Sequence, residues 1–124
     1  GESRLSGWLD STLDANSNPI EVDMAGVGLI DGAGNEITTI EAMPLSAAEY
    51  QVLKSDPELR SLTTEQDRTE YMGLRMCYEM MAKCDSSLSW KKFRQLSLPL
   101  LGKIAERVIA AVGQPDGGGV LGEA

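Results

Sequence analysis

The chain has 124 residues, of which 42% are hydrophobic and 24% charged, and its formal net charge is −8. This composition is typical of a soluble globular domain with a modest core. The chain contains no histidine, so it lacks the commonest general base near neutral pH and the commonest metal ligand. An acidic chain also repels phosphate backbones. We therefore expect a protein that is not an enzyme, needs no cofactor and binds no nucleic acid.

The charge is divided unevenly along the chain. Residues 1–70 carry 14 acidic and 4 basic residues, whereas residues 71–124 carry 5 acidic and 7 basic ones. Such complementary halves permit pairing between copies, so a homo-oligomer is compatible with the sequence. No apolar run approaches the ~18 residues that a membrane span needs, and the N-terminus lacks the pattern of a signal peptide. We therefore expect no membrane partner.

The first part of the chain predicts an arm followed by a β hairpin. Residues 1–19 are polar and end in the turn-rich NSNP, which indicates an N-terminal arm or a short leading helix. Strict alternation of apolar and polar residues begins at Ile20, and the sequence DGAGN at 31–35 is a strong turn signal. We therefore predict an antiparallel hairpin over residues 20–43.

After Pro44 the pattern changes to a helical one. Ser46 and Glu49 form a capping box at the start of the first predicted helix. Thr63 and Gln66 match a second capping box, and two later serines are suitable N-caps for two further helices. The predicted helices cover about residues 47–54, 65–83, 90–96 and 98–112.

The remaining signals complete the predicted architecture. Asp56-Pro57 predicts a short turn at most, and Gly113 lies where a helix-ending glycine belongs. Residues 114–124 are glycine-rich and predict a flexible tail. The sequence thus predicts one globular domain over residues 20–113. Its fold class is α+β and mainly α-helical, with a short N-terminal β hairpin followed by a small helical bundle.

The stretch YMGLRMCYEMMAKC at residues 71–84 holds four methionines and two cysteines. Such sulfur ligands suit Cu(I), but here they fall on two different lines of one helix and no second cluster completes a coordination sphere. We therefore expect no metal site. Cys77 and Cys84 lie about 10.5 Å apart along a helix, too far for a disulfide, and should be buried free thiols.

The same helix has two apolar lines that could serve different purposes. One line should face the core; it consists of Tyr71, Leu74, Tyr78 and Met81. The other, with Met72, Met76 and Met80 at i, i+4 and i+8, is our candidate partner-binding surface, because flexible methionines adapt to varied shapes. The alternative is a helix buried on all sides in the middle of the bundle.

The order of these parts resembles a known family. The segment Met43-Pro44-Leu45-Ser46-Ala47-Ala48-Glu49-Tyr50 follows a strand, a long helix spans about Arg68 to Cys84, and a closing helix leads to a glycine-containing tail from Gly113. Tail assembly chaperones of long-tailed bacteriophages often carry a strand that leads into a Pro-Leu-Thr/Ser-x-x-Glu helix start. The resemblance covers about residues 20–113. The N-terminal arm and the density of methionines depart from the family pattern.

The resemblance implies a mostly helical, non-enzymatic protein of the host cytoplasm. Such a chaperone binds the tape-measure protein and tail-tube subunits before the tail polymerises, and a longer form made by ribosomal frameshifting is usual in the family. No residue-level binding motif carries over. Two alternatives stay open from the residues alone. One is a structural virion component, such as a head–tail connector or capsid accessory protein, and the other is a carboxylate- or thiol-based enzyme.

Overall fold

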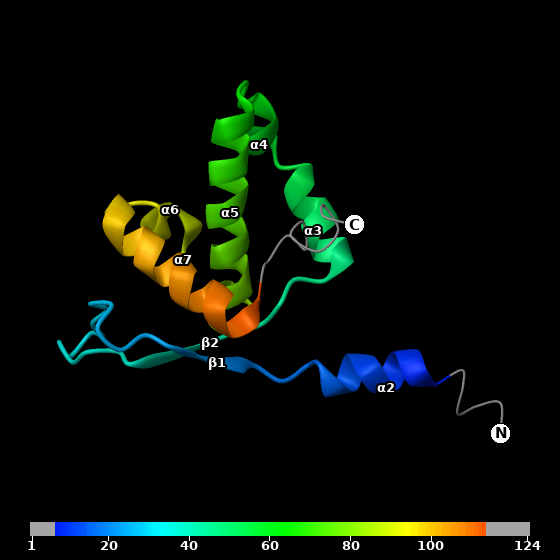
Figure 1. Cartoon of the computed structure of the whole chain (residues 1–124), viewed down its shortest axis with the longest axis horizontal. Coiled ribbons are helices and arrows are strands. Elements are labelled where there is room, and N and C mark those ends of the chain that lie inside the picture. The colour runs from blue at the N-terminus through cyan, green and yellow to red at the C-terminus, as the bar shows by residue number, and fades with distance from the viewer. Residues whose placement is uncertain (1–6, 114–124) are drawn as a thin grey trace.

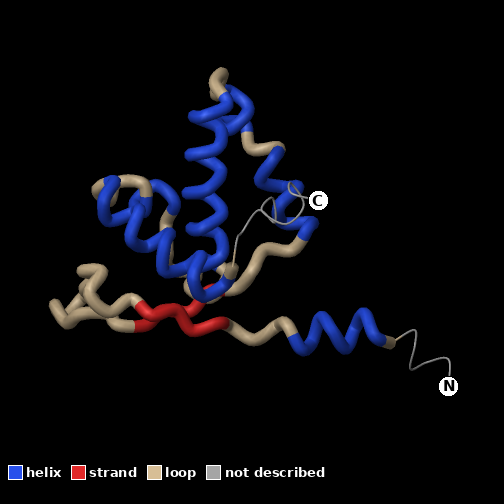
Figure 2. Tube along the Cα trace, in the orientation of Figure 1, coloured by secondary structure: helices blue, strands red, loops and turns tan. Residues whose placement is uncertain are grey.

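The computed structural model describes residues 7–113. Its helices and strands, in chain order, are α2 (Trp8–Ala15), β1 (Ile20–Asp23), β2 (Thr39–Ala42), α3 (Ala47–Lys54), α4 (Pro57–Ser61), α5 (Glu65–Ala82), α6 (Trp90–Phe93) and α7 (Leu98–Val112) (Figures 1 and 2). This is the predicted α+β, mainly helical fold, with the hairpin placed between α2 and the helical bundle. Within the described residues, none of the helices has both the length and the apolar character that a membrane crossing requires.

The hairpin confirms the prediction for residues 20–43, although its strands are short. β1 and β2 pair antiparallel over four residues each. The regular ladder ends there because Gly26 and Gly28 adopt φ values of +80° and +104°, which turn the chain out of the strand conformation. Beyond this bend a single antiparallel bridge joins Ile30 to Glu36.

The predicted start of α3 is confirmed and the predicted cap of α5 is wrong by one residue. The Ser46 hydroxyl accepts from the Glu49 N–H, and the Glu49 carboxylate accepts from the Ser46 N–H at 2.7 Å, so the capping box is complete. At α5, however, Thr64 and not Thr63 is extended and accepts from the Asp67 N–H at 3.0 Å. A cap at Thr64 places Asp67 in the first turn, where the helix dipole favours a carboxylate.

The two shortest helices also differ from the prediction. Pro57–Ser61 forms α4, where only a short turn is predicted, because Asp56 caps the helix and proline fits its first position. α6 stops at Phe93, whereas the sequence predicts a helix over 90–96. After Phe93 the N–H groups of Gln95 and Leu96 donate to carbonyls three residues back, at Lys92 and Phe93, so the chain tightens into turns before Ser97 becomes extended to cap α7.

The core lies between the hairpin and the helices on one side of α5. In Figure 1, α5 stands between α6 and α7 on one side and α3 and α4 on the other, while the hairpin crosses its lower end. The main buried cluster consists of Val22, Met24, Val27, Ala42, Cys77, Tyr78, Met80, Met81, Phe93, Leu101, Ile104 and Val108. The line predicted to face the core does so, since Tyr71, Tyr78 and Met81 are buried and Leu74 packs against the cluster.

Hydrogen bonds to backbone carbonyl groups join the hairpin to the helices. The Met43 N–H donates to the Met80 carbonyl at 3.0 Å, which satisfies a carbonyl in the last turn of α5 that has no partner inside the helix. The Arg107 guanidinium of α7 donates to the Asp23 carbonyl at 3.0 Å. The hairpin is therefore fixed to α5 and α7 by directional bonds as well as by apolar contact.

α2 lies apart from the rest of the fold. It extends away from the bundle (Figure 1), and none of its residues is buried. Of the two alternatives predicted for residues 1–19, an arm or a short leading helix, the structure shows a short helix at Trp8–Ala15. Residues 1–6 and the flexible tail predicted over 114–124 lie outside the described residues.

The burial of the methionines can be tested by stability measurements. Met80→Ala should destabilise the protein by about 2–5 kcal/mol, because the side chain is 0% exposed and its loss leaves a cavity. Met72→Ala, in the same helix but only half-buried, should cost clearly less. Urea unfolding followed by circular dichroism measures both free energies, and equal losses would contradict the placement of Met80 in the core.

Candidate functional site

A groove runs along the N-terminal half of α5, between α3 and α4 on one side and α7 on the other. Its volume is about 530 Å³. The apolar residues that line it are Tyr50, Leu59, Met72, Met76, Ala105 and Ile109. We call it the methionine groove, because two flexible thioether side chains of α5 take part in its lining.

The structure separates the three methionines of the predicted partner-binding line. Met72 is half-buried and lines the groove, and Met76 lines it as well but is only 3% exposed. Met80 is 0% exposed and belongs to the main core. The prediction of Met80 as a surface contact is therefore wrong, because the hairpin packs over the last turns of α5. Met72 and Met76 remain in the candidate site.

Gly73 gives the groove its open space. It lies on the exposed side of α5 and lines the groove, and a Cβ added there meets no atom within 4 Å. A glycine in a helix interior costs about 1 kcal/mol relative to alanine. Because the fold itself leaves room for a side chain, a larger residue at this position fills the groove without disturbing the packing behind it.

Two cations and one carboxylate stand around the methionine groove. The Lys54 ammonium lies 5.5 Å from the centre of the Tyr50 ring. The Arg68 guanidinium donates to the Leu62 carbonyl at 2.9 Å and lies 3.5 Å from the Glu65 carboxylate. The Glu65 side chain is 91% exposed and that of Arg68 is half-buried, so the pair is weak. The edge of the groove is therefore net positive in a protein that is acidic as a whole.

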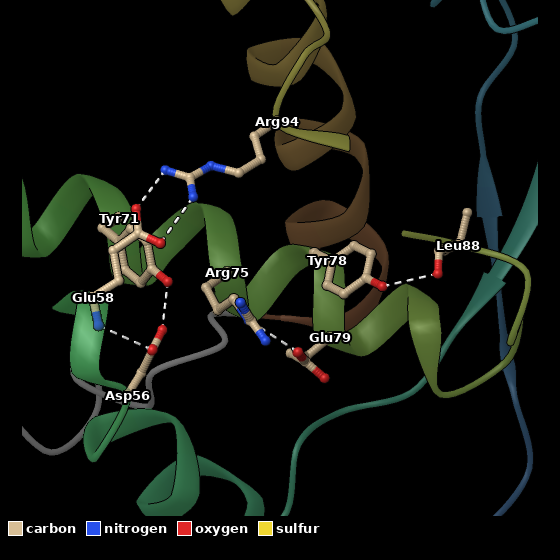
Figure 3. Close-up of polar contacts among 8 residues, drawn as sticks. All are labelled: Asp56, Glu58, Tyr71, Arg75, Tyr78, Glu79, Leu88 and Arg94. Atoms are coloured by element: carbon tan, nitrogen blue, oxygen red, sulfur yellow. Dashed lines mark hydrogen bonds and ion pairs between the residues drawn. The ribbon is translucent and has the colours of Figure 1, made fainter. Parts of the chain in front are cut away.

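A second face of α5 carries a network of charged and aromatic side chains (Figure 3). Arg94, just after α6, makes two hydrogen bonds to the Glu58 carboxylate of α4, at 2.9 and 2.7 Å. The Tyr71 hydroxyl of α5 donates to the Asp56 carboxylate that caps α4. These contacts join α4, α5 and α6, and so they hold one wall of the methionine groove against the central helix.

The aromatic side of this network is formed around Trp90. The guanidinium groups of Arg75 and Arg94 lie 4.7 and 5.1 Å from the centre of its ring, and such cation–π contacts are worth about 0.5–2 kcal/mol each. Arg75 also donates to Glu79 at 3.0 Å (Figure 3). Both arginines are thus held by a ring and a carboxylate together.

Glu58 and Tyr71 of this network do not change their protonation states near neutral pH. The bidentate contact with Arg94 holds the pKa of the Glu58 carboxyl below its usual range. Burial, and after it the hydrogen bond to Asp56, raises the pKa of Tyr71 to about 12, so this phenol keeps its proton and stays a donor near neutral pH. All of these side chains lie outside the linings of the grooves, and their geometry is that of a structural brace.

A further groove, which we call the hairpin groove, has a volume of about 750 Å³. Its lining includes Leu29, Ile40, Met81, Cys84, Leu88, Phe93 and Ile104. The charged residues in its lining are Glu41 and Asp85, so this groove is negative where the methionine groove is positive. Both grooves are apolar inside, and the charges of their lining residues distinguish them.

Both cysteines are free, as their spacing predicts. Cys77 is buried in the core, and burial raises the pKa of its thiol to about 12. The prediction that Cys84 is buried is wrong, because it lies half-buried in the lining of the hairpin groove. The pKa of Cys84 is raised by burial and then by the charge of Glu41. Both thiols are therefore protonated near neutral pH and are weak nucleophiles.

Sequence reasoning missed most of the methionine groove. Tyr50, Leu59 and Ile109 come from three other helices, and nothing in their local patterns relates them to Met72. One signal was available: Gly73 interrupts a long helix at a position where a helix former is favoured.

No protein-family model, curated protein or solved structure matches this chain.

The thiol chemistry leads to a test with iodoacetamide at about pH 8, where reaction requires the thiolate. Cys84 should react more slowly than free cysteine, and Cys77 should react only on unfolding, because both pKa values are raised and Cys77 is 1% exposed. Mass spectrometry of the native protein and of Cys84→Ser assigns the sites. Modification of Cys84 faster than of glutathione would instead indicate an activated thiol.

The brace leads to a test of stability against pH. Glu58 has a lowered pKa in the folded state, so its pair with Arg94 stabilises the fold above the ordinary carboxyl pKa and loses this effect as the pH falls through the lowered value. Glu58→Gln should cost about 0.5 kcal/mol at neutral pH, the size of an exposed ion pair, and less in acid. Urea unfolding of Glu58→Gln, Arg94→Gln and the double variant measures this, and a difference that grows in acid would contradict it.

Proposed function

We propose that this protein binds an amphipathic helical segment of another protein in the methionine groove. The observation that carries this proposal is an apolar groove of about 530 Å³ that is lined by Met72, Met76 and the open Gly73. An amphipathic helix laid into an apolar groove is a recurring mode of peptide recognition. Methionine suits such a groove because it repacks against different side chains at low cost.

The biological role that we propose is that of a tail assembly chaperone of a long-tailed bacteriophage. The clients are then the tape-measure protein, which is a long helical chain, and tail-tube subunits, bound in the host cytoplasm before polymerisation. Support comes from the resemblance over residues 20–113 and from the groove. A net charge of −8 also helps to keep a complex with an apolar client soluble.

A structural virion component is the second candidate, and the isolated position of α2 favours it. A large exposed apolar patch marks a protein–protein interaction site, as a subunit of an assembly needs. The two roles differ in where the protein is found. A chaperone leaves before the particle is complete, whereas a connector or capsid accessory protein forms a stable ring and remains in purified virions.

The test of the groove uses two helical glycines that both leave room for a side chain. Gly73 lines the methionine groove and Gly102 lies on the exposed side of α7, and a Cβ at either position meets no atom within 4 Å. Both Gly73→Leu and Gly102→Leu should therefore fold, and both remove a helix-weakening residue. Only Gly73→Leu fills the groove, so it should weaken client binding by about tenfold or more.

The client for this experiment is identified by the gene neighbourhood. A downstream frame reached by frameshifting and followed by a very long coiled-coil gene would supply the tape-measure protein, and fragments of it are coexpressed with each variant. The wild type and Gly102→Leu should keep a fragment soluble and elute with it in size exclusion, and Gly73→Leu should not. Equal binding by all three proteins would exclude the methionine groove as the client site.

A further inference from the structure

α2 presents an apolar face that has no partner among the described residues 7–113. Trp8, Leu9 and Leu13 are 62%, 55% and 62% exposed. On a helix these positions fall within about 140° of one another, whereas Asp10 and Asp14 lie on the opposite face. Large apolar side chains that gather on one exposed face are a mark of an interaction surface.

We infer that α2 of one copy docks in the methionine groove of a second copy. A helix of eight residues is about 12 Å long, a length suited to a short groove between helices. Leu9 and Leu13, one turn apart, are positioned to meet Met72 and Met76, and Trp8 provides the kind of large anchor that dominates binding energy. Gly73 leaves the space that these side chains need.

Charge selects this groove over the other one. α2 carries the acidic residues Asp10 and Asp14 and no basic residue. The helix as a whole is therefore attracted to the methionine groove, whose charged lining residues are Lys54, Arg68 and, as the only carboxylate among the described residues, Glu65. The hairpin groove offers a poor alternative, since its charged lining residues are both acidic. Complementarity of net charge steers the encounter toward one site and disfavours the wrong one.

The placement of α2 favours a second copy over its own groove. α2 extends outward from β1, away from the bundle (Figure 1), and β1 is fixed by its pairing with β2 and by the bond from Arg107 to Asp23. The four residues 16–19 that connect the two elements span at most ~14 Å, so α2 stays near the start of β1. Exchange between two copies, in which each gives one α2 and receives one, closes the assembly with two identical contacts.

The contact has a consequence for the client, and this step alone rests on the proposed function. If the client binds in the methionine groove, α2 of the partner copy and the client compete for one site. The exchanged helix then covers the apolar groove until a client displaces it, which limits non-specific association of the free protein. The self-contact itself needs no client and is measured on the protein alone.

The experiment measures association of the full chain by sedimentation velocity between about 1 and about 200 µM, because the dimer must depend on concentration. Leu13→Asp places a charge on the apolar face of α2, and Ser11→Asp places the same charge on its polar face. Gly73→Leu fills the groove, and Gly102→Leu is its control. Leu13→Asp and Gly73→Leu should each raise the dissociation constant by about tenfold or more, and the two controls should match the wild type.

Mixing the two defective variants gives an independent check. Leu13→Asp keeps an intact groove and Gly73→Leu keeps an intact α2, so together they should form a mixed dimer with one good contact, and neither should do so alone. Larger species that respond to the same two substitutions support the contact equally, since a head-to-tail contact can propagate. A monomer at all concentrations, or a dimer that either defective variant leaves intact, would overturn the inference.

The two proposals fail in different ways. If the wild type dimerises as described but binds no tape-measure fragment, the chaperone role is wrong and the self-contact stands. If Leu13→Asp and the wild type show the same degree of self-association at every concentration and bind the fragment equally well, the self-contact is wrong and the client site stands. If both are correct, Leu13→Asp should bind the fragment more tightly than the wild type, because its groove is free.

Discussion

The way in which the hairpin closes over the last turns of α5 determines the rest of the structure. A helix ends with carbonyl groups that have no partner of their own, and here the Met43 N–H supplies one by binding the Met80 carbonyl at 3.0 Å. The same approach brings β2 against α5 and buries Met80 completely. One end of α5 is therefore sealed between the hairpin and α7, while its other end keeps an open side. The methionine groove is what remains where the hairpin does not reach.

The methionine groove can bind a partner only if the helices that form its walls are held in position. α4 is a short helix, and a single turn is not stable by itself. Its position depends on the double hydrogen bond from Arg94 to Glu58 and on the bond from Tyr71 to Asp56. Because these contacts lie on a different face of α5, they hold the wall without occupying the groove. The site thus combines a fixed frame with an adaptable lining of methionines, an arrangement that suits binding more than chemistry.

Local signals in the sequence were sufficient for most of the fold. The capping box at Ser46 and the glycine at Gly113 act over a single turn, so they could be read without knowledge of the tertiary structure. The cap at Thr64 places Asp67 in the first turn of α5, but this preference is too small to decide between two adjacent threonines from the pattern alone. The division between Met72 and Met80 could not be predicted either, because periodicity gives the face of a helix but not what covers it. The other groove residues come from helices distant in sequence, so only the packing of the whole chain brings them together.

If both proposals hold, α2 and the client segment are alternative occupants of one groove. The properties of α2 then predict those that a client needs. The groove offers an apolar lining with Lys54 and Arg68 beside it. An occupant therefore needs large apolar side chains within one face of a helix and a net negative charge, as α2 has. A basic amphipathic helix would meet the cations and lose affinity. The same reasoning separates this groove from the hairpin groove, whose acidic lining favours the opposite charge. Two apolar grooves in one small protein can thus select different partners by the charges beside them.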